Sequence, residues 1–249
     1  MKRIRLRRNR PSALAAALAL MLTMFSVFLI TQAAGGRDDR AASAGGYGTA
    51  DIRMEGMQAQ LEIIGRYDQA MEAQVAAAQC LAGGGAGIVV PDGESYAVVY
   101  AAHADADAYK ARAGSERSAH IVSGSGLTLR ASGSAAQAAA LQQAVDLLRT
   151  LAVQTGSLAS SLESGGTDAG SVQALISVYL TQGRSARAAL SGSAGQDASA
   201  MKLLRAVENS LVRLQGAHDA PNAGSLRRIY AAGRLEWIGL LDGLREGYV

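Results

Sequence analysis

The chain has 249 residues, of which 49% are hydrophobic, enough for one or two folded domains with a core of ordinary size. Its formal net charge is +3, but six Lys and Arg side chains lie within the first ten residues, so the rest of the chain is mildly acidic. This charge distribution argues against a nucleic-acid-binding surface on the folded part. The single cysteine, Cys80, excludes an intramolecular disulfide and a thiolate metal cluster.

The N-terminal sequence has the pattern of a membrane anchor. A basic tail at residues 1–12 precedes an apolar segment at residues 13–32, whose uncharged run would span about 27 Å as a helix. The positive charges before it predict a cytoplasmic N-terminus and an exported body. A signal peptide cleaved near Ala33 is the alternative, although the apolar run exceeds the roughly 7 to 15 residues of a usual signal-peptide core. Small and polar residues at 33–51 then form a linker.

The segment 52–131 predicts an α+β domain with the element order β-α-β-β-α-β. Apolar and polar residues alternate from Met57 to Ile63, and the spacing then becomes helical until the glycines that begin at Gly83. The remaining elements are strands at 86–90 and 95–102 on either side of a Pro-Asp-Gly-Glu turn, a short helix at 104–112, and a fourth strand. The fourth strand combines 119–122 with 127–130, either kinked or paired as a hairpin. We expect a ferredoxin-like, four-stranded antiparallel sheet with both helices on one face and the other face free for a partner or ligand.

Two half-repeats in this segment resemble the SPOR (sporulation-related repeat) domain. The matching residues are Ile64-Gly65-Arg66-Tyr67 followed by Ala70, and Ser95-Tyr96-Ala97-Val98-Val99-Tyr100 followed by Ala106 or Ala108. Many SPOR proteins also share the layout of an anchor, a linker and an exported domain. The resemblance implies binding to peptidoglycan glycan strands that have lost their stem peptides, without catalysis. One departure is Ile63, because family members often carry glutamine at that position.

Five side chains of the predicted sheet are candidates for glycan binding. Gln58, Gln60 and Glu62 form the polar face of the first strand, which predicts a position on the solvent side. Tyr96 and Tyr100 share one face of the third strand, where tyrosine rings would stack on sugars if that face is open. The alternative is that this face packs under the two helices.

The sequence gives little support to catalysis or to a cofactor. His103, Asp105 and Asp107 alternate as in some oxygen-ligand loops, but aspartates just before a helix more commonly cap its free N–H groups. No lysine and hydroxyl residue follow the glycines near Gly83, so they do not form a phosphate-binding loop. We therefore predict no catalytic residues, no metal site and no cofactor.

The C-terminal region, residues 132–249, predicts an antiparallel helical bundle. Apolar residues recur at spacings of three and four in four segments, which begin near Ala135, Val172, Met201 and Leu226. The bundle core is the simplest interpretation of these stripes, and a seam for a partner is the alternative.

The preferred interpretation is a single-pass, non-catalytic envelope protein that binds peptidoglycan glycan strands in cell division or sporulation. The alternative is a structural or adaptor protein that binds other envelope or divisome proteins through its sheet face and bundle, without glycan.

Overall fold

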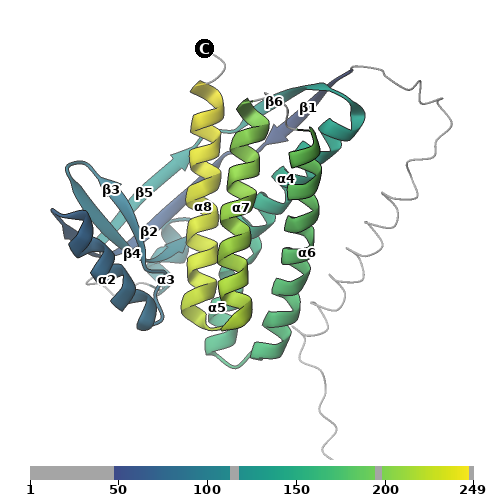
Figure 1. The fold of residues 1–249 in the computed structure, drawn as a ribbon. Coiled ribbons are helices and arrows are strands. Elements are labelled where there is room, and N and C mark those ends of the chain that lie inside the picture. Colours follow the sequence, from purple (N-terminus) through teal and green to yellow (C-terminus); the bar gives the residue numbers. More distant parts are fainter. Residues whose placement is uncertain (1–47, 113–117, 194–197, 247–249) are drawn as a thin grey trace, which may run out of the picture.

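The computed structural model describes residues 48–112, 118–193 and 198–246, which form an α+β fold with antiparallel sheets and a helical bundle (Figure 1). The expected α+β class is confirmed at this level. The predicted membrane anchor at 13–32 lies outside the described residues, and within the described residues no helix is long and apolar enough to cross a membrane. The elements before the bundle are β1 (Gly48–Met54), β2 (Met57–Tyr67), α2 (Ala70–Ala82), β3 (Ile88–Asp92), β4 (Ser95–His103), α3 (Ala106–Arg112), β5 (Ser118–Gly124) and β6 (Leu127–Gly133).

The larger sheet has the strand order β3-β4-β2-β5, and all its neighbouring strands are antiparallel. On one face α2 packs through Ala73, Ala77 and Cys80 against Val98 of β4. The other face is not free, because α8 (Ala223–Glu246) covers much of it. The expectation of an open sheet face is therefore wrong. The physical reason is that Ala59, Leu61 and Ile63 of β2 form an apolar face that needs a covering layer, and the chain's own last helix supplies it.

A second pair of strands extends the sheet toward the bundle. β1 pairs with β6, and the register continues unchanged across the break, since Met54 lies opposite Leu127 and Met57 opposite Gly124. The two backbones come very close here, because a Cβ atom on Gly126 would lie 2.8 Å from the Gly56 nitrogen. β5 and β6 are thus successive parts of one kinked strand, and the hairpin alternative is wrong. β1 was not predicted as a strand.

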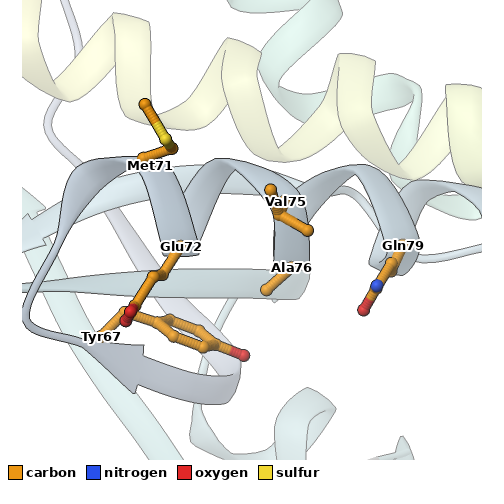
Figure 2. A pocket seen from close by; sticks show the side chains of 6 residues that line it. All are labelled: Tyr67, Met71, Glu72, Val75, Ala76 and Gln79. Atoms are coloured by element: carbon orange, nitrogen blue, oxygen red, sulfur yellow. The ribbon is translucent and has the colours of Figure 1, made fainter.

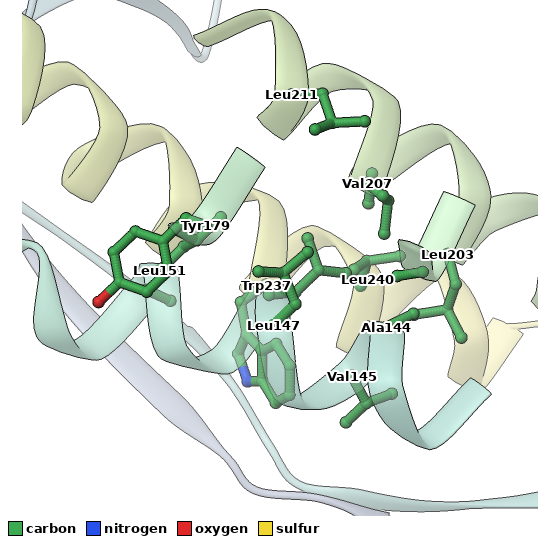
Figure 3. Close-up of a cluster of buried hydrophobic side chains, with 14 of the residues drawn as sticks. Ala144, Val145, Leu147, Leu151, Tyr179, Leu203, Val207, Leu211, Trp237 and Leu240 are labelled. Atoms are coloured by element: carbon green, nitrogen blue, oxygen red, sulfur yellow. The ribbon is translucent and has the colours of Figure 1, made fainter. Parts of the chain in front are cut away.

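In the part that the structure describes, the C-terminal region is helical, with five helices where the sequence indicated four segments. Its helices are α4 (Ala135–Gln154), α5 (Gly156–Glu163), α6 (Ala169–Ser193), α7 (Ala198–Asp219) and α8. α4, α6, α7 and α8 surround one apolar core, which contains most of the predicted stripe positions, although Met201 is exposed (Figure 3). The first predicted helix is divided at Thr155, whose hydroxyl donates to the Leu151 carbonyl at 2.7 Å, and α5 begins at the next residue.

The last helix, α8, belongs to the core of the bundle and to the core of the sheet. Leu226 and Trp237 pack in the bundle, whereas Ala231 and Ile238 pack on the sheet with Leu61 of β2. A helix that packs on two opposite sides is buried around much of its circumference, and half of the residues of α8 are buried, including Arg234. The sheet and the bundle therefore share one structural element.

Candidate functional site

A polar, partly exposed site lies at one end of the larger sheet. Here the two carboxylate oxygens of Asp92 face two different basic side chains: Arg66 Nε lies 2.6 Å from Oδ2, and His120 Nδ1 lies 3.7 Å from Oδ1. A guanidinium nitrogen of Arg66 also donates to Ser118 Oγ at 3.4 Å. We call Arg66, Asp92, Ser118 and His120 the Asp92 cluster.

The strand register explains how residues from β2, β3 and β5 meet. Ala97 of β4 lies opposite both Arg66 and Val90. Its small side chain leaves room for Arg66 and Asp92 to meet above β4. Asp92 ends β3 at a tight turn in which Gly93 has a φ of 66°, a conformation that favours glycine. Ser95 Oγ donates to the Asp92 carbonyl at 2.9 Å and closes this turn.

Among the described residues, the cluster remains accessible because α8 packs toward the opposite ends of β2 and β5. The C-terminal part of α8 packs against Gly124, at the end of β5, whereas Ser118 and His120 lie at its beginning. The Arg66 side chain keeps 46% of its surface exposed and that of His120 keeps 32%. Donors and an acceptor therefore face solvent on the sheet surface.

Electrostatics keep Asp92 ionised. The hydrogen bond from Arg66 is the main cause of a pKa below the usual aspartate value; burial opposes it, and the charges of Arg66 and His120 add smaller effects that lower the pKa further. The cluster thus presents an anionic acceptor between a guanidinium and an imidazole at neutral pH. Ser118 Oγ accepts its hydrogen bond from Arg66, which is not the nucleophile–base contact of covalent catalysis.

The structure places the five predicted glycan-binding residues on the face covered by α2 and α3, where two are buried, two are half-buried and one is exposed. Gln60 and Glu62 are buried, so the expectation of a solvent-side position holds only for Gln58. Tyr96 and Tyr100 are half-buried and pack beside the α2 contact, as the alternative reading of their face expected. None of the five belongs to the Asp92 cluster.

A buried polar pair lies deeper on the same face. His103 Nε2 and Glu62 Oε2 are 3.1 Å apart, with 6% and 4% of their side-chain surfaces exposed. Tyr109 of α3 meets the His103 ring edge-on, with ring centroids 5.5 Å apart. Gln60 lies opposite His103, and its Oε1 is buried without a hydrogen-bond partner among the described residues. Burial of this depth favours a structural role, because a ligand would have to displace α3 to reach the pair.

A shallow groove of about 470 Å³ runs along the outer side of α2 (Figure 2). Met71 and Val75 are 75% and 56% exposed at its upper wall, and Tyr67 lies at its base. Glu72 and Gln79 lie toward its two ends, two helical turns apart. We call this surface, lined by Tyr67, Met71, Glu72, Val75, Ala76 and Gln79, the α2 groove.

The metal interpretation of His103, Asp105 and Asp107 gains no support from the geometry. Asp105 Oδ1 accepts a hydrogen bond from the Ala108 backbone N–H at 2.8 Å, as a residue before a helix does. Among the described residues, no group of three or more His, Cys, Asp or Glu side chains lies close enough to hold a metal ion.

Comparisons with protein-family models, with curated proteins and with solved structures gave no match. The candidate site therefore rests on its own geometry. Sequence reasoning missed the Asp92 cluster, since its residues are up to 54 positions apart and belong to no local motif. Asp92, in the predicted turn, was the one residue of the cluster that the sequence marked. Its partners Arg66 and His120 could not be predicted, because they depend on the strand order.

Proposed function

We propose that this chain is a non-catalytic, membrane-anchored protein of the cell envelope that binds peptidoglycan glycan strands in division or sporulation. Residues 57–124 would form its SPOR-like, ferredoxin-like domain. The strand order β3-β4-β2-β5 with helices after β2 and β4 supports this assignment, because a split β-α-β unit arranges its strands in this way. A fold alone does not define a ligand, so the ligand must be argued from the site.

The observation that carries the proposal is the exposed Asp92 cluster on the sheet surface. Sugars are recognised by side chains that offer donors and acceptors together, and Arg66, Asp92, Ser118 and His120 offer both. Removal of a stem peptide also leaves a carboxylate on the glycan strand. The guanidinium of Arg66 suits such an anion through the donors that Asp92 does not occupy. This cluster replaces the five predicted residues as the proposed glycan contact.

The second candidate function is that of an adaptor that binds another envelope protein. The exposed Met71 and Val75 favour it, because neighbouring apolar side chains on a helix surface are typical of protein contacts. The surface differs from the one expected from sequence, since α8 covers the sheet face that an adaptor was expected to use.

Co-sedimentation of the full chain in detergent with purified cell walls tests the proposal. Walls treated with an amidase carry glycan without stem peptides, whereas untreated walls do not. We expect amidase treatment to increase the bound fraction several-fold. Equal binding to both preparations would exclude the glycan proposal, and binding to neither would leave the adaptor function as the better account.

A further inference from the structure

The helix that forms the α2 groove carries almost no charged side chains. α2 presents Met71, Val75 and Ala78 outward, and over its 13 residues Glu72 is the only charged side chain. A solvated helix face normally carries charges of both signs. The composition of this face is therefore that of a surface that contacts protein.

The polar side chains of the α2 groove are complementary to each other. Glu72 provides a carboxylate acceptor toward one end, and Gln79 provides an amide donor toward the other. Neither side chain has a hydrogen-bond partner among the described residues. A single α2 helix cannot join them, because they are seven residues apart, or about 10 Å along the axis.

Two copies of α2 related by a twofold axis can pair Glu72 with Gln79. If two copies of α2 pack antiparallel with the axis between Val75 and Ala76, residue 72 of each copy lies beside residue 79 of the other. Both Gln79 amides then donate to the opposite Glu72 carboxylates, while the two Val75 side chains meet at the centre. An isologous interface requires this kind of self-complementary surface. The small Ala76 at the centre permits the close approach of about 8–10 Å that packed helices have.

We propose that the α2 groove is a self-association surface whose partner is a second copy of this chain, with the two α2 helices antiparallel across Val75. The proposal is independent of glycan binding, since the Asp92 cluster lies on the face of the sheet turned toward α8. One helix face buries less than the roughly 1,200–2,000 Å² of a standard stable interface, so the association is expected to be weak and concentration-dependent. Anchorage in one membrane would raise the local concentration of copies.

Disulfide cross-linking of the full chain tests this contact directly. V75C places two thiols at the axis, so oxidation should produce a covalent dimer. V212C on α7 is the matched control, because Val212 is 75% exposed and lies outside the α2 groove. The wild-type chain, whose cysteine is the buried Cys80, measures any cross-linking that Cys80 itself causes. We expect V75C to cross-link at least tenfold faster than V212C, and equal rates would overturn the proposal.

The pairing of Glu72 with Gln79 is tested in the same V75C background. Q79E places two carboxylates together at each end of the contact and should slow cross-linking several-fold. Adding E72K to Q79E converts each repulsive pair into an ion pair and should restore the rate. If V75C cross-links rapidly but E72K does not reverse the effect of Q79E, the antiparallel arrangement is wrong. Unchanged thermal unfolding of each variant will show that folding is not the cause.

Discussion

Arg234 of α8 donates a hydrogen bond to the backbone carbonyl of Gln58 in β2 and thereby joins the last helix of the bundle to an inner strand of the sheet. The same guanidinium donates to Tyr230 Oη at 2.8 Å and to the Ala152 carbonyl at 3.3 Å. Ala152 lies in the last turn of α4, where helix carbonyls carry partial negative charge. A buried cation is thus stabilised by neutral acceptors from three elements.

Substitution R234A should destabilise the whole protein. It leaves two carbonyls and one hydroxyl without their donor, which we expect to lower the free energy of unfolding by about 2–4 kcal/mol. R228A is the control, since Arg228 is an exposed residue of the same helix and its loss should cost less than about 0.5 kcal/mol. Urea unfolding followed by Trp237 fluorescence and by circular dichroism measures both. Two separate transitions would contradict the shared role of α8.

The buried contact between His103 and Glu62 should also contribute to stability. Substitution H103A leaves the Glu62 carboxylate buried without this partner, and we expect a cost of about 3 kcal/mol. H218A provides the comparison, because the contact of His218 with Asp219 is partly exposed, at 29% and 64% of the two side chains, and is worth less than about 1 kcal/mol. If chemical denaturation gives the same loss for both variants, the buried pair has no special role.

The close approach of Gly56 and Gly126 should make this kink intolerant of side chains. A Cβ atom at residue 126 would lie 2.8 Å from the Gly56 nitrogen and 2.9 Å from the Met54 carbonyl oxygen, both of which belong to the backbone. We expect G126A to cost about 1–3 kcal/mol. G216A adds its methyl group to open space within α7 and should stabilise the protein by about 0.5–1 kcal/mol. Equal melting temperatures for the two variants would contradict the close contact.

Tyr179 should make stability depend on alkaline pH. Burial in the bundle raises the pKa of its hydroxyl from 10.0 to about 12. The folded state therefore holds this proton more tightly than the unfolded state, so the contribution is complete below pH 10 and is lost as pH rises from 10 toward 12. The full loss is roughly 3 kcal/mol. Unfolding free energies of the wild-type chain and Y179F should converge or cross over this range, and parallel pH profiles would argue against it.

The sequence predicts local elements better than it predicts which surfaces remain open. The spacing in Leu141, Val145 and Leu148 determines a helix wherever it packs, and α4 was correctly expected. Exposure of Glu62 could not be predicted in the same way, because its burial depends on α3 and on a histidine 41 residues away. For the same reason, the sequence predicted α8 as a helix of the bundle but did not predict that it also packs on the sheet.

The Asp92 cluster illustrates the same limit for function. Arg66, Asp92 and His120 are each unremarkable in sequence, and they meet only because β2 lies between β4 and β5. The tyrosines of β4 formed a more conspicuous pattern, but α2 packs against their face. The chemical character of a side chain can be inferred from the sequence, but which side chains meet in space depends on the strand order of the sheet.

The most direct test of glycan binding is the affinity of the full chain for soluble glycan fragments without stem peptides, compared between R66A and R130A. Both substitutions remove an arginine from an exposed ion pair, with Asp92 in one case and with Asp51 in the other, but only Arg66 belongs to the Asp92 cluster. We predict that R66A weakens binding by about tenfold or more, which corresponds to about 1.4 kcal/mol, while R130A leaves it unchanged. Equal affinities of the two variants, or binding by neither variant nor the wild-type chain, would contradict the account.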